Sequence, residues 1–366
     1  MSMLTFDSKG KLVLSGAILG VLAAVLAKTG NPGNMAICIA CFIRDIAGAM
    51  KLHQAAVVQY FRPEIVGFVC GAFAISLATN EYRTTAGSAP MVRFALGFIM
   101  MIGALVFLGC PLRMVIRMSA GDANAYVALV GFAAGIFTGT MFLKNGFSLG
   151  RAYTVRKENG YILPCILVIL FILSLTTSLF AVSEKGPGSM HAPAILALVV
   201  ALIIGAIAQK NRICFAGGIR DVILMGDFSL LSILGGLFVV MLIFNIVTGS
   251  FHFGFTGHPV AHAQHLWNFL GLYAVGFAAV LAGGCPMRQL ILAGQGSSDS
   301  AVTILGLLIG AACAHNFGLA GAAAAAATAD TPANPGGPGP AGKVALIGCI
   351  VVLFIIAALY TRKQEE

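Results

Sequence analysis

Long apolar segments determine the fold class of this chain, because they recur along its whole length and few charges interrupt them. Hydrophobic residues make up 59% of the 366 positions and charged residues 10%, against roughly 25% charged in an average soluble domain. Several segments reach the ~17–25 residues that a helix needs to cross a bilayer. We therefore expect an all-α polytopic membrane protein with about ten transmembrane helices, at 12–27, 63–80, 92–109, 125–142, 161–182, 192–209, 229–248, 266–283, 300–320 and 344–360.

A polar signature occurs twice within this apolar sequence. The first copy contains Cys38, Arg44-Asp45 and Gly109-Cys110-Pro111-x-Arg113, and the second contains Cys214, Arg220-Asp221 and Gly284-Cys285-Pro286-x-Arg288. The two cysteines are 72 residues apart in the first copy and 71 in the second, and a GxxxG pair begins 21 residues after the second cysteine in both. A charged side chain within a membrane-spanning segment costs free energy, so its presence there indicates a structural or functional role. The matched positions therefore indicate a duplicated unit.

The duplication divides the chain and predicts its topology. We expect a first repeat with four spans and a re-entrant segment at 1–150, a connector with the fifth span at 151–190, a second repeat at 191–321, and an Ala/Pro/Gly-rich loop with the last span at 322–366. The second copy begins five spans after the first, and this odd offset predicts two inverted repeats. Loops on the amino-terminal side hold 14 Lys and Arg against 8 opposite, which favours both termini in the cytoplasm.

Two short or broken helices are expected in each copy. Segments 34–50 and 211–225 are too short and too polar to span, which is typical of re-entrant helices buried in protein. The second break is Gly-Cys-Pro, where glycine ends one helix and proline begins the next. This predicts structural roles for Gly109, Pro111, Gly284 and Pro286. Each cysteine would then lie at a helix start, where unpaired N–H groups attract negative charge. Arg113 and Arg288 follow by three residues and share their cysteine's face.

The chemistry of the signature suits a soft anion. A thiol has a reference pKa of about 8.5 and is a weak, polarisable donor. Weak donors at successive depths can hold an anion without trapping it. We therefore expect a sulfur- or selenium-containing anion to follow a substrate path made of Cys38, Cys110, Cys214, Cys285, Arg113 and Arg288. No catalytic residue, cofactor or metal is expected. The net charge of +9 is attributed to anionic lipid and substrate, not to nucleic acid.

The Arg-Asp dipeptides are assigned mainly to structure. Adjacent residues on a helix do not face each other. Arg44 is therefore not expected to pair with Asp45, nor Arg220 with Asp221, and each should find its partner elsewhere.

Other signals permit competing functions. Cys38 and Cys41 form a CxxC, which can indicate a membrane thiol–disulfide oxidoreductase, although the second copy has Gly217 in place of the second cysteine. A scaffold for a cytoplasmic sulfur-transfer protein would need no path at all. His258, His262 and His265 could surround a metal, but no carboxylate or cysteine accompanies them, which favours a solvated, pH-sensitive loop. Free thiols that only fill space are expected at Cys70, Cys165, Cys313 and Cys349.

The Cys-x5-Arg-Asp pair and the two Gly-Cys-Pro-x-Arg motifs resemble the YeeE/YedE family of bacterial inner-membrane proteins, over almost the whole chain. The similarity is greatest to the YedE branch, which is associated with selenium transport. The resemblance implies an hourglass-shaped helical importer of thiosulfate-like anions. It also implies that Cys38, Cys110 and Cys285 pass the anion inward, with Cys214 as a fourth. A small cytoplasmic sulfur carrier of the TusA type is the implied partner. The sequence has no G-x-x-x-x-G-K-[ST] motif, so we expect no energy from nucleotide.

Overall fold

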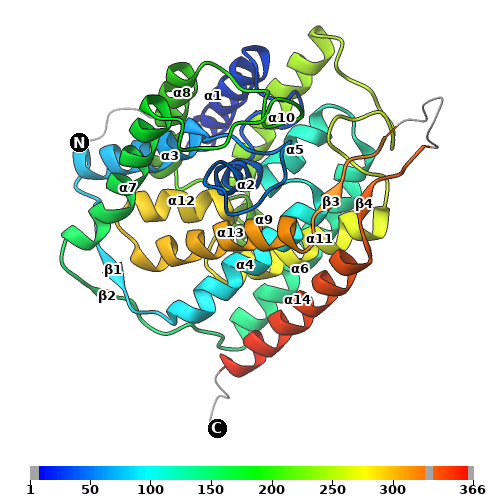
Figure 1. The fold of residues 1–366 in the computed structure, drawn as a ribbon. Coiled ribbons are helices and arrows are strands. Elements are labelled where there is room, and N and C mark those ends of the chain that lie inside the picture. Colours follow the sequence, from blue (N-terminus) through cyan, green and yellow to red (C-terminus); the bar gives the residue numbers. More distant parts are fainter. Residues whose placement is uncertain (1–7, 326–332, 362–366) are drawn as a thin grey trace.

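The computed structural model describes residues 8–325 and 333–361, which form fourteen α-helices (Figure 1). These are α1 Ser8–Lys28, α2 Ile39–Ala49, α3 Pro63–Ala78, α4 Pro90–Phe107, α5 Pro111–Ser119, α6 Ala123–Lys144, α7 Glu158–Thr176, α8 Ala194–Lys210, α9 Phe215–Met225, α10 Ser229–Val247, α11 His265–Leu281, α12 Pro286–Gly294, α13 Ser298–Asn316 and α14 Pro340–Leu359. Two-residue strands pair β1 (Thr85–Ala86) with β2 (Tyr153–Thr154) and β3 (Gly321–Ala322) with β4 (Gly337–Pro338). The expected all-α class is confirmed.

Ten helices of 16 residues or more overlap the ten predicted spans, one each. Nine helices within the described residues are long and apolar enough to cross a membrane, and α3 is a shorter apolar helix of 16 residues. Helix α14 runs along the outside of the molecule (Figure 1) and exposes large apolar side chains such as Val344, Ile347 and Val351. An apolar exterior of this kind suits lipid as the solvent. The chain is a multi-pass membrane protein.

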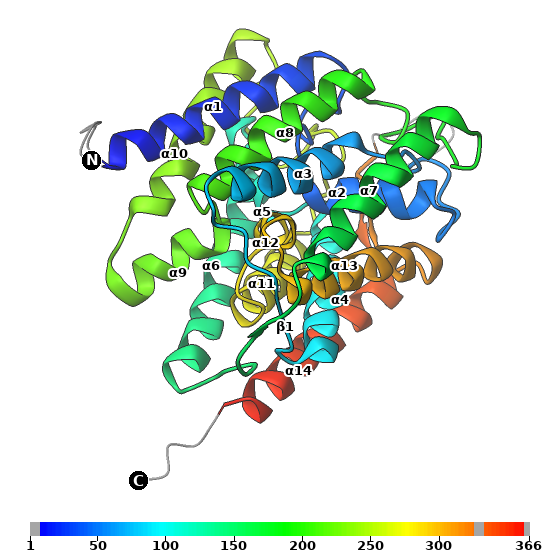
Figure 2. The same ribbon diagram turned by 90° about the vertical axis from the view of Figure 1, so that its left-hand side faces the viewer.

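Four short helices begin directly after the signature cysteines: α2, α5, α9 and α12, each of 9 or 11 residues. All residues of α2 are buried. Figure 2 shows α5 and α12 near the middle of the molecule, with α9 closer to its edge. Helices α2 and α9 lie within the segments 34–50 and 211–225, where short helices were expected.

Long helices of one half pack mainly against long helices of the other. Helix α4 packs on α13 and α6 on α11, while α1 packs on α10 and α3 on α8 (Figure 2). Glycine permits this closeness: a Cβ atom on Gly135 would lie 2.1 Å from the carbonyl oxygen of Tyr273, and one on Gly306 would lie 2.1 Å from that of Phe94. Both glycines belong to the GxxxG pairs matched between the copies. The duplicated spacing therefore marks two corresponding helix crossings.

The loops gather on two faces. Face A is formed by residues 50–62, 177–193, 248–264 and the described parts of 317–339, and face B by residues 79–89, 145–157 and 295–297. Ser183 N–H donates to Gln59 O at 2.8 Å on face A, and Arg83 N–H donates to Gln295 O at 3.1 Å on face B. Part of the Ala/Pro/Gly-rich loop, residues 326–332, lies outside the described residues, as do both ends of the chain.

Candidate functional site

The two signature cysteines of the first half meet in the interior. The sulfur atoms of Cys38 and Cys110 lie 3.7 Å apart, although 72 residues separate them in the chain. Cys38 precedes α2, and its Sγ accepts a hydrogen bond from Cys41 N–H at 3.4 Å. Cys110 precedes α5, whose first residue is Pro111. Both thiols are buried, so the starts of two short helices meet at one pair of sulfur atoms.

The second half repeats this arrangement. The sulfur atoms of Cys214 and Cys285 lie 4.0 Å apart, and Cys214 Sγ accepts a hydrogen bond from Gly217 N–H at 3.2 Å. Cys285 precedes α12, which starts at Pro286. Cys214 is 7% exposed and Cys285 1%. The structure thus brings the four predicted cysteines together as two pairs, one from each half.

The glycine of each Gly-Cys-Pro motif makes room for the arginine of the same motif. The preceding helices α4 and α11 end earlier, at Phe107 and Leu281. The residue directly before each glycine, Leu108 or Gly283, has a left-handed φ angle, 66° or 83°. The prediction that Gly109 and Gly284 end these helices is therefore wrong. A Cβ atom on either glycine would lie 2.7 Å from the side chain of the arginine four residues later. The motif thus needs glycine for packing.

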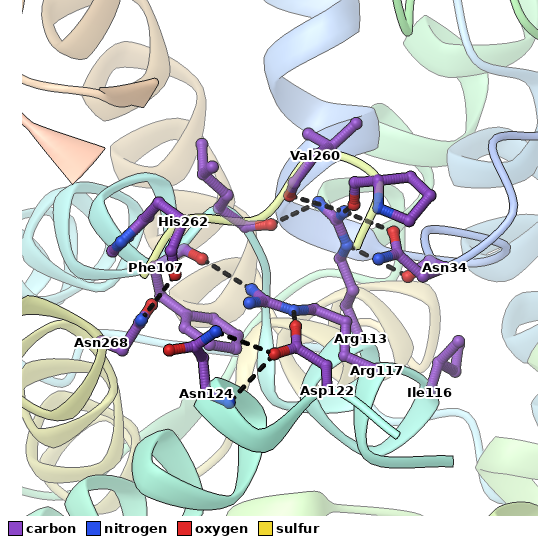
Figure 3. A network of polar contacts seen from close by, with 12 residues as sticks. Asn34, Phe107, Arg113, Ile116, Arg117, Asp122, Asn124, Val260, His262 and Asn268 are labelled. Carbon is purple, nitrogen blue, oxygen red and sulfur yellow. Dashed lines mark hydrogen bonds and ion pairs between the residues drawn. The ribbon is translucent and has the colours of Figure 1, made fainter. Parts of the chain in front are cut away.

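Arg113 is completely buried, and each of its donors has an acceptor (Figure 3). Nε donates to Asn34 O at 3.1 Å, and Nη2 donates to Asn34 Oδ1 at 2.8 Å and to Val260 O at 3.1 Å. Nη1 donates to Leu108 O and, at 3.5 Å, to Cys41 Sγ. A guanidinium has five N–H donors, so none is left for an anion. Val260 has a φ of 50°, which is unusual for a β-branched residue.

Arg288 holds the same place in the second half, but its surroundings differ. Its Nη1 is buried and has no hydrogen-bond partner within the part of the chain that the structure describes. Cys214, Cys285 and Arg212 lie close enough for their charges to interact with this guanidinium. The two arginines predicted to face the substrate are therefore not equivalent.

A second buried arginine, Arg117, was not expected from the sequence. Its Nε lies 2.7 Å from Asp122 Oδ2, and both side chains are fully buried (Figure 3). Leu292 and Ser297 occupy the corresponding positions of the second half, so this ion pair has no counterpart there. The available signal was a second basic residue one helical turn after Arg113, inside an apolar segment.

The histidine loop is packed against the helices. His262 is 1% exposed, its Nε2 lies 2.8 Å from Val106 O, and its Nδ1 accepts from Gln264 N–H. Burial lowers the pKa of His262 to about 4. The expectation of a solvated loop is wrong for this residue, because His262 attaches residues 248–264 to the end of α4. Within the described residues no group of three or more His, Cys, Asp or Glu could hold a metal.

Both Arg-Asp dipeptides form internal ion pairs, at 2.6 Å for Arg44–Asp45 and 2.8 Å for Arg220–Asp221. The prediction that neighbours would not pair is wrong, because the long arginine side chain reaches back to the adjacent carboxylate. Asp45 also accepts from Arg62 Nε at 2.8 Å. The first pair is 3% and 0% exposed and the second 31% and 12%. These contacts agree with a structural role.

Cys41 does not form a disulfide with Cys38, and all nine cysteines are free. Outside the two pairs, Cys165 is exposed, while Cys70, Cys313 and Cys349 are half-buried. Among the residues that the structure describes, these four thiols have no hydrogen-bond partner that would indicate chemistry.

Comparison with protein families finds that residues 210–366 match a family described as sulphur transport. No curated protein matches the chain. The matched region contains α9 and α12, and therefore the second thiol pair and Arg288.

Proposed function

We propose that this chain, whose residues 210–366 match a family described as sulphur transport, imports a small sulfur- or selenium-containing anion along its paired cysteines. The family match, together with the nine candidate membrane-spanning helices among the described residues, supports a multi-pass, sulfur-related transporter. We infer beyond this the substrate, its path through the protein and the direction of transport.

The observation that carries the proposal is the pair of thiols at each set of helix starts. The two Sγ–Sγ distances, 3.7 and 4.0 Å, are nearly equal in the two halves. Backbone N–H groups and the positive ends of short helices favour a negative charge beside each pair. The thiols themselves contribute weak donors that a soft sulfur or selenium atom can contact and leave. Cys38 and Cys110 would hold the anion first, followed by Cys214 and Cys285.

The proposed direction follows from the topology. The repeats are taken as inverted, and the exchanged helix pairings, α4 on α13 and α6 on α11, support this. Face A would then be periplasmic and face B cytoplasmic in a bacterial inner membrane, in keeping with the excess of Lys and Arg on the face B side. A small cytoplasmic sulfur carrier of the TusA type would receive the imported sulfur species at face B.

Uptake of labelled thiosulfate or selenium compounds into liposomes containing the purified chain tests the proposal. Cys110→Ala and Cys285→Ala should abolish uptake, while Cys41→Ala should be mild. Cys349→Ala is the matched control, because this thiol is half-buried and belongs to neither pair. A thiol–disulfide oxidoreductase would show the reverse order, with a mixed disulfide that can be trapped at Cys38 or Cys41. A scaffold would show no uptake that depends on any of these cysteines.

A further inference from the structure

The histidines of this chain gather at one end of the molecule. All seven lie in the face A loops or at the helix ends that join them: His53, His191, His252, His258, His262, His265 and His315. The residues of face B include no histidine. Histidine is the side chain that titrates most readily between about pH 5 and 8. Face A is therefore the end of the protein whose charge responds to mild acidification.

Residues 252–262 of face A lie over Arg113, and we call this segment the lid. Arg113 bridges the lid and the first cysteine segment, because its Nη2 donates to Val260 O at 3.1 Å and its Nη1 to Cys41 Sγ at 3.5 Å (Figure 3). Asn124 Nδ2 holds the lid at a second point, through Phe255 O at 2.8 Å. The left-handed φ of 50° at Val260 is costly for a β-branched residue, so the closed lid carries strain that opening would release.

His262 attaches the carboxyl end of the lid in a way that admits only the neutral ring (Figure 3). Its Nε2 lies 2.8 Å from Val106 O, which can only accept, and its Nδ1 lies 3.2 Å from Gln264 N, which can only donate. Nε2 therefore carries the ring hydrogen. A second proton would go to Nδ1 and place two N–H groups against each other. The ring is 1% exposed, so water does not separate them. The closed lid is incompatible with a protonated His262.

The charges around His262 do not compensate an added proton. The charged or titratable groups near it are Arg113 and Arg117 on α5, Asp122 before α6, His265 on α11 and, in the lid, His258, which shares the neighbours Arg117 and Asp122. Arg117 and His265 repel a proton, and Asp122 is already paired with Arg117 at 2.7 Å. The described parts of 317–339 have no titratable side chain. Burial remains the main effect, and it lowers the pKa of His262 to about 4.

His53 makes the same two contacts in another face A loop. Its Nε2 lies 3.0 Å from Arg44 O, and its Nδ1 accepts from Ala55 N–H at 3.3 Å. In both loops the backbone donor follows the histidine by two residues. His53 lies between α2 and α3 and His262 between α10 and α11, and these loops do not correspond in the two copies. The shared geometry therefore does not follow from the duplication, which favours a common role for neutral histidine on this face.

We propose that residues 252–262 form a lid over the first thiol pair and that protonation of His262 opens it. The inference rests on the proposed function, since a lid has a role only where a path begins beneath it. Opening frees the Arg113 donor that Val260 O now occupies. Acidification of face A thus admits the anion to Cys38 and Cys110, and neutral pH keeps the entrance closed.

Hydrogen–deuterium exchange of the purified full chain in detergent, corrected for the pH dependence of intrinsic exchange, tests the lid. The N–H groups of His252 and Gly254 report its opening, because they donate to Ala120 O and Gly121 O when it is closed. The closed state has a His262 pKa of about 4 and a solvated histidine one of about 6.5, so protection of the lid should fall roughly 20- to 30-fold from about pH 7.5 to pH 5. Peptides from α14 should keep their protection.

His262→Gln should abolish this fall, because glutamine can still donate to Val106 O but does not titrate. His191→Gln is the matched control, since it removes a histidine from another face A loop, and it should leave the fall unchanged. Equal lid protection at both pH values in the unmodified chain, or an undiminished fall in His262→Gln, would overturn the inference, while thiosulfate uptake into liposomes would leave the proposed function standing. If His262→Gln does not fold, the unmodified chain decides alone. A lid that opens as expected in a chain that takes up no anion at either pH would overturn the proposed function instead.

Discussion

Replacing Asp45 by asparagine should destabilise the protein far more than the same change at Asp221. Asp45 is fully buried and accepts from Arg44 at 2.6 Å and from Arg62 at 2.8 Å. Asparagine removes the charge that compensates two buried guanidinium groups. The amide N–H₂ group of the new asparagine would also be placed against an N–H group of Arg44 or Arg62, where the wild-type carboxylate oxygen accepts a hydrogen bond. Breaking a buried ion pair by removing one partner costs about 3–5 kcal/mol.

Asp221 provides the internal control, because it occupies the same position in the other copy. It pairs with Arg220 alone, and the two side chains are 12% and 31% exposed. Water can solvate the arginine once the carboxylate is gone, so Asp221→Asn should cost about 1 kcal/mol or less. The difference between the two variants isolates the effect of burial from that of the substitution.

Reversible unfolding in mixed detergent and sodium dodecyl sulfate micelles, followed by circular dichroism, measures both costs. The expected gap between the variants is at least about 2 kcal/mol in the free energy of unfolding. If Asp45→Asn does not fold at all, protease resistance of membrane-inserted protein gives the same ranking, with Asp221→Asn close to the unmodified chain. Equal losses, or a larger loss at Asp221, would refute the assignment of Asp45 to a buried charge network.

Three further predictions follow from the packing. Arg113→Gln should lower the free energy of unfolding by about 2 kcal/mol or more, because it leaves buried carbonyl oxygens without a donor. The unfolding assay used for Asp45 measures this, and a loss no greater than that of Arg288→Gln in that assay would contradict the prediction. Gly135→Ala and Gly306→Ala should each lower the free energy of unfolding by about 1–3 kcal/mol, because the added methyl group meets a carbonyl oxygen. Gly348 has open space around it, so Gly348→Ala should leave the free energy of unfolding unchanged in the same assay. Burial lowers the pKa of His262 to about 4 in the folded protein, whereas an unfolded histidine has a pKa of about 6.5. Between these two values the unfolded chain is protonated at His262 and the folded chain is not, so the free energy of unfolding should fall as the pH drops from about 6.5 towards 4. His262→Gln should flatten this part of the stability profile, and an unchanged profile would show that His262 is not its source.

The helices and the cysteine helix starts could be predicted because each depends on local sequence. Apolar length identifies a span, and Gly-Cys-Pro identifies a break, wherever the segment lies in the fold. Contacts that depend on a distant loop could not be predicted. Nothing near Arg113 in the chain indicates that Val260, 147 residues away, supplies one of its acceptors. The Arg44–Asp45 pairing was missed for a different reason, since helical geometry places Cβ atoms but not the ends of long side chains.

The crossings between the halves have a consequence for how such a chain could arise. Gly135 and Gly306 each meet a carbonyl oxygen of the opposite copy, so a polypeptide with one copy alone would leave these close-packing surfaces uncovered. Two identical single-copy chains could cover them by offering the same surface to each other, as an isologous homodimer does. We infer that the two copies of the present chain correspond to the two chains of such a dimer joined in one polypeptide, which would leave each arginine free to change on its own.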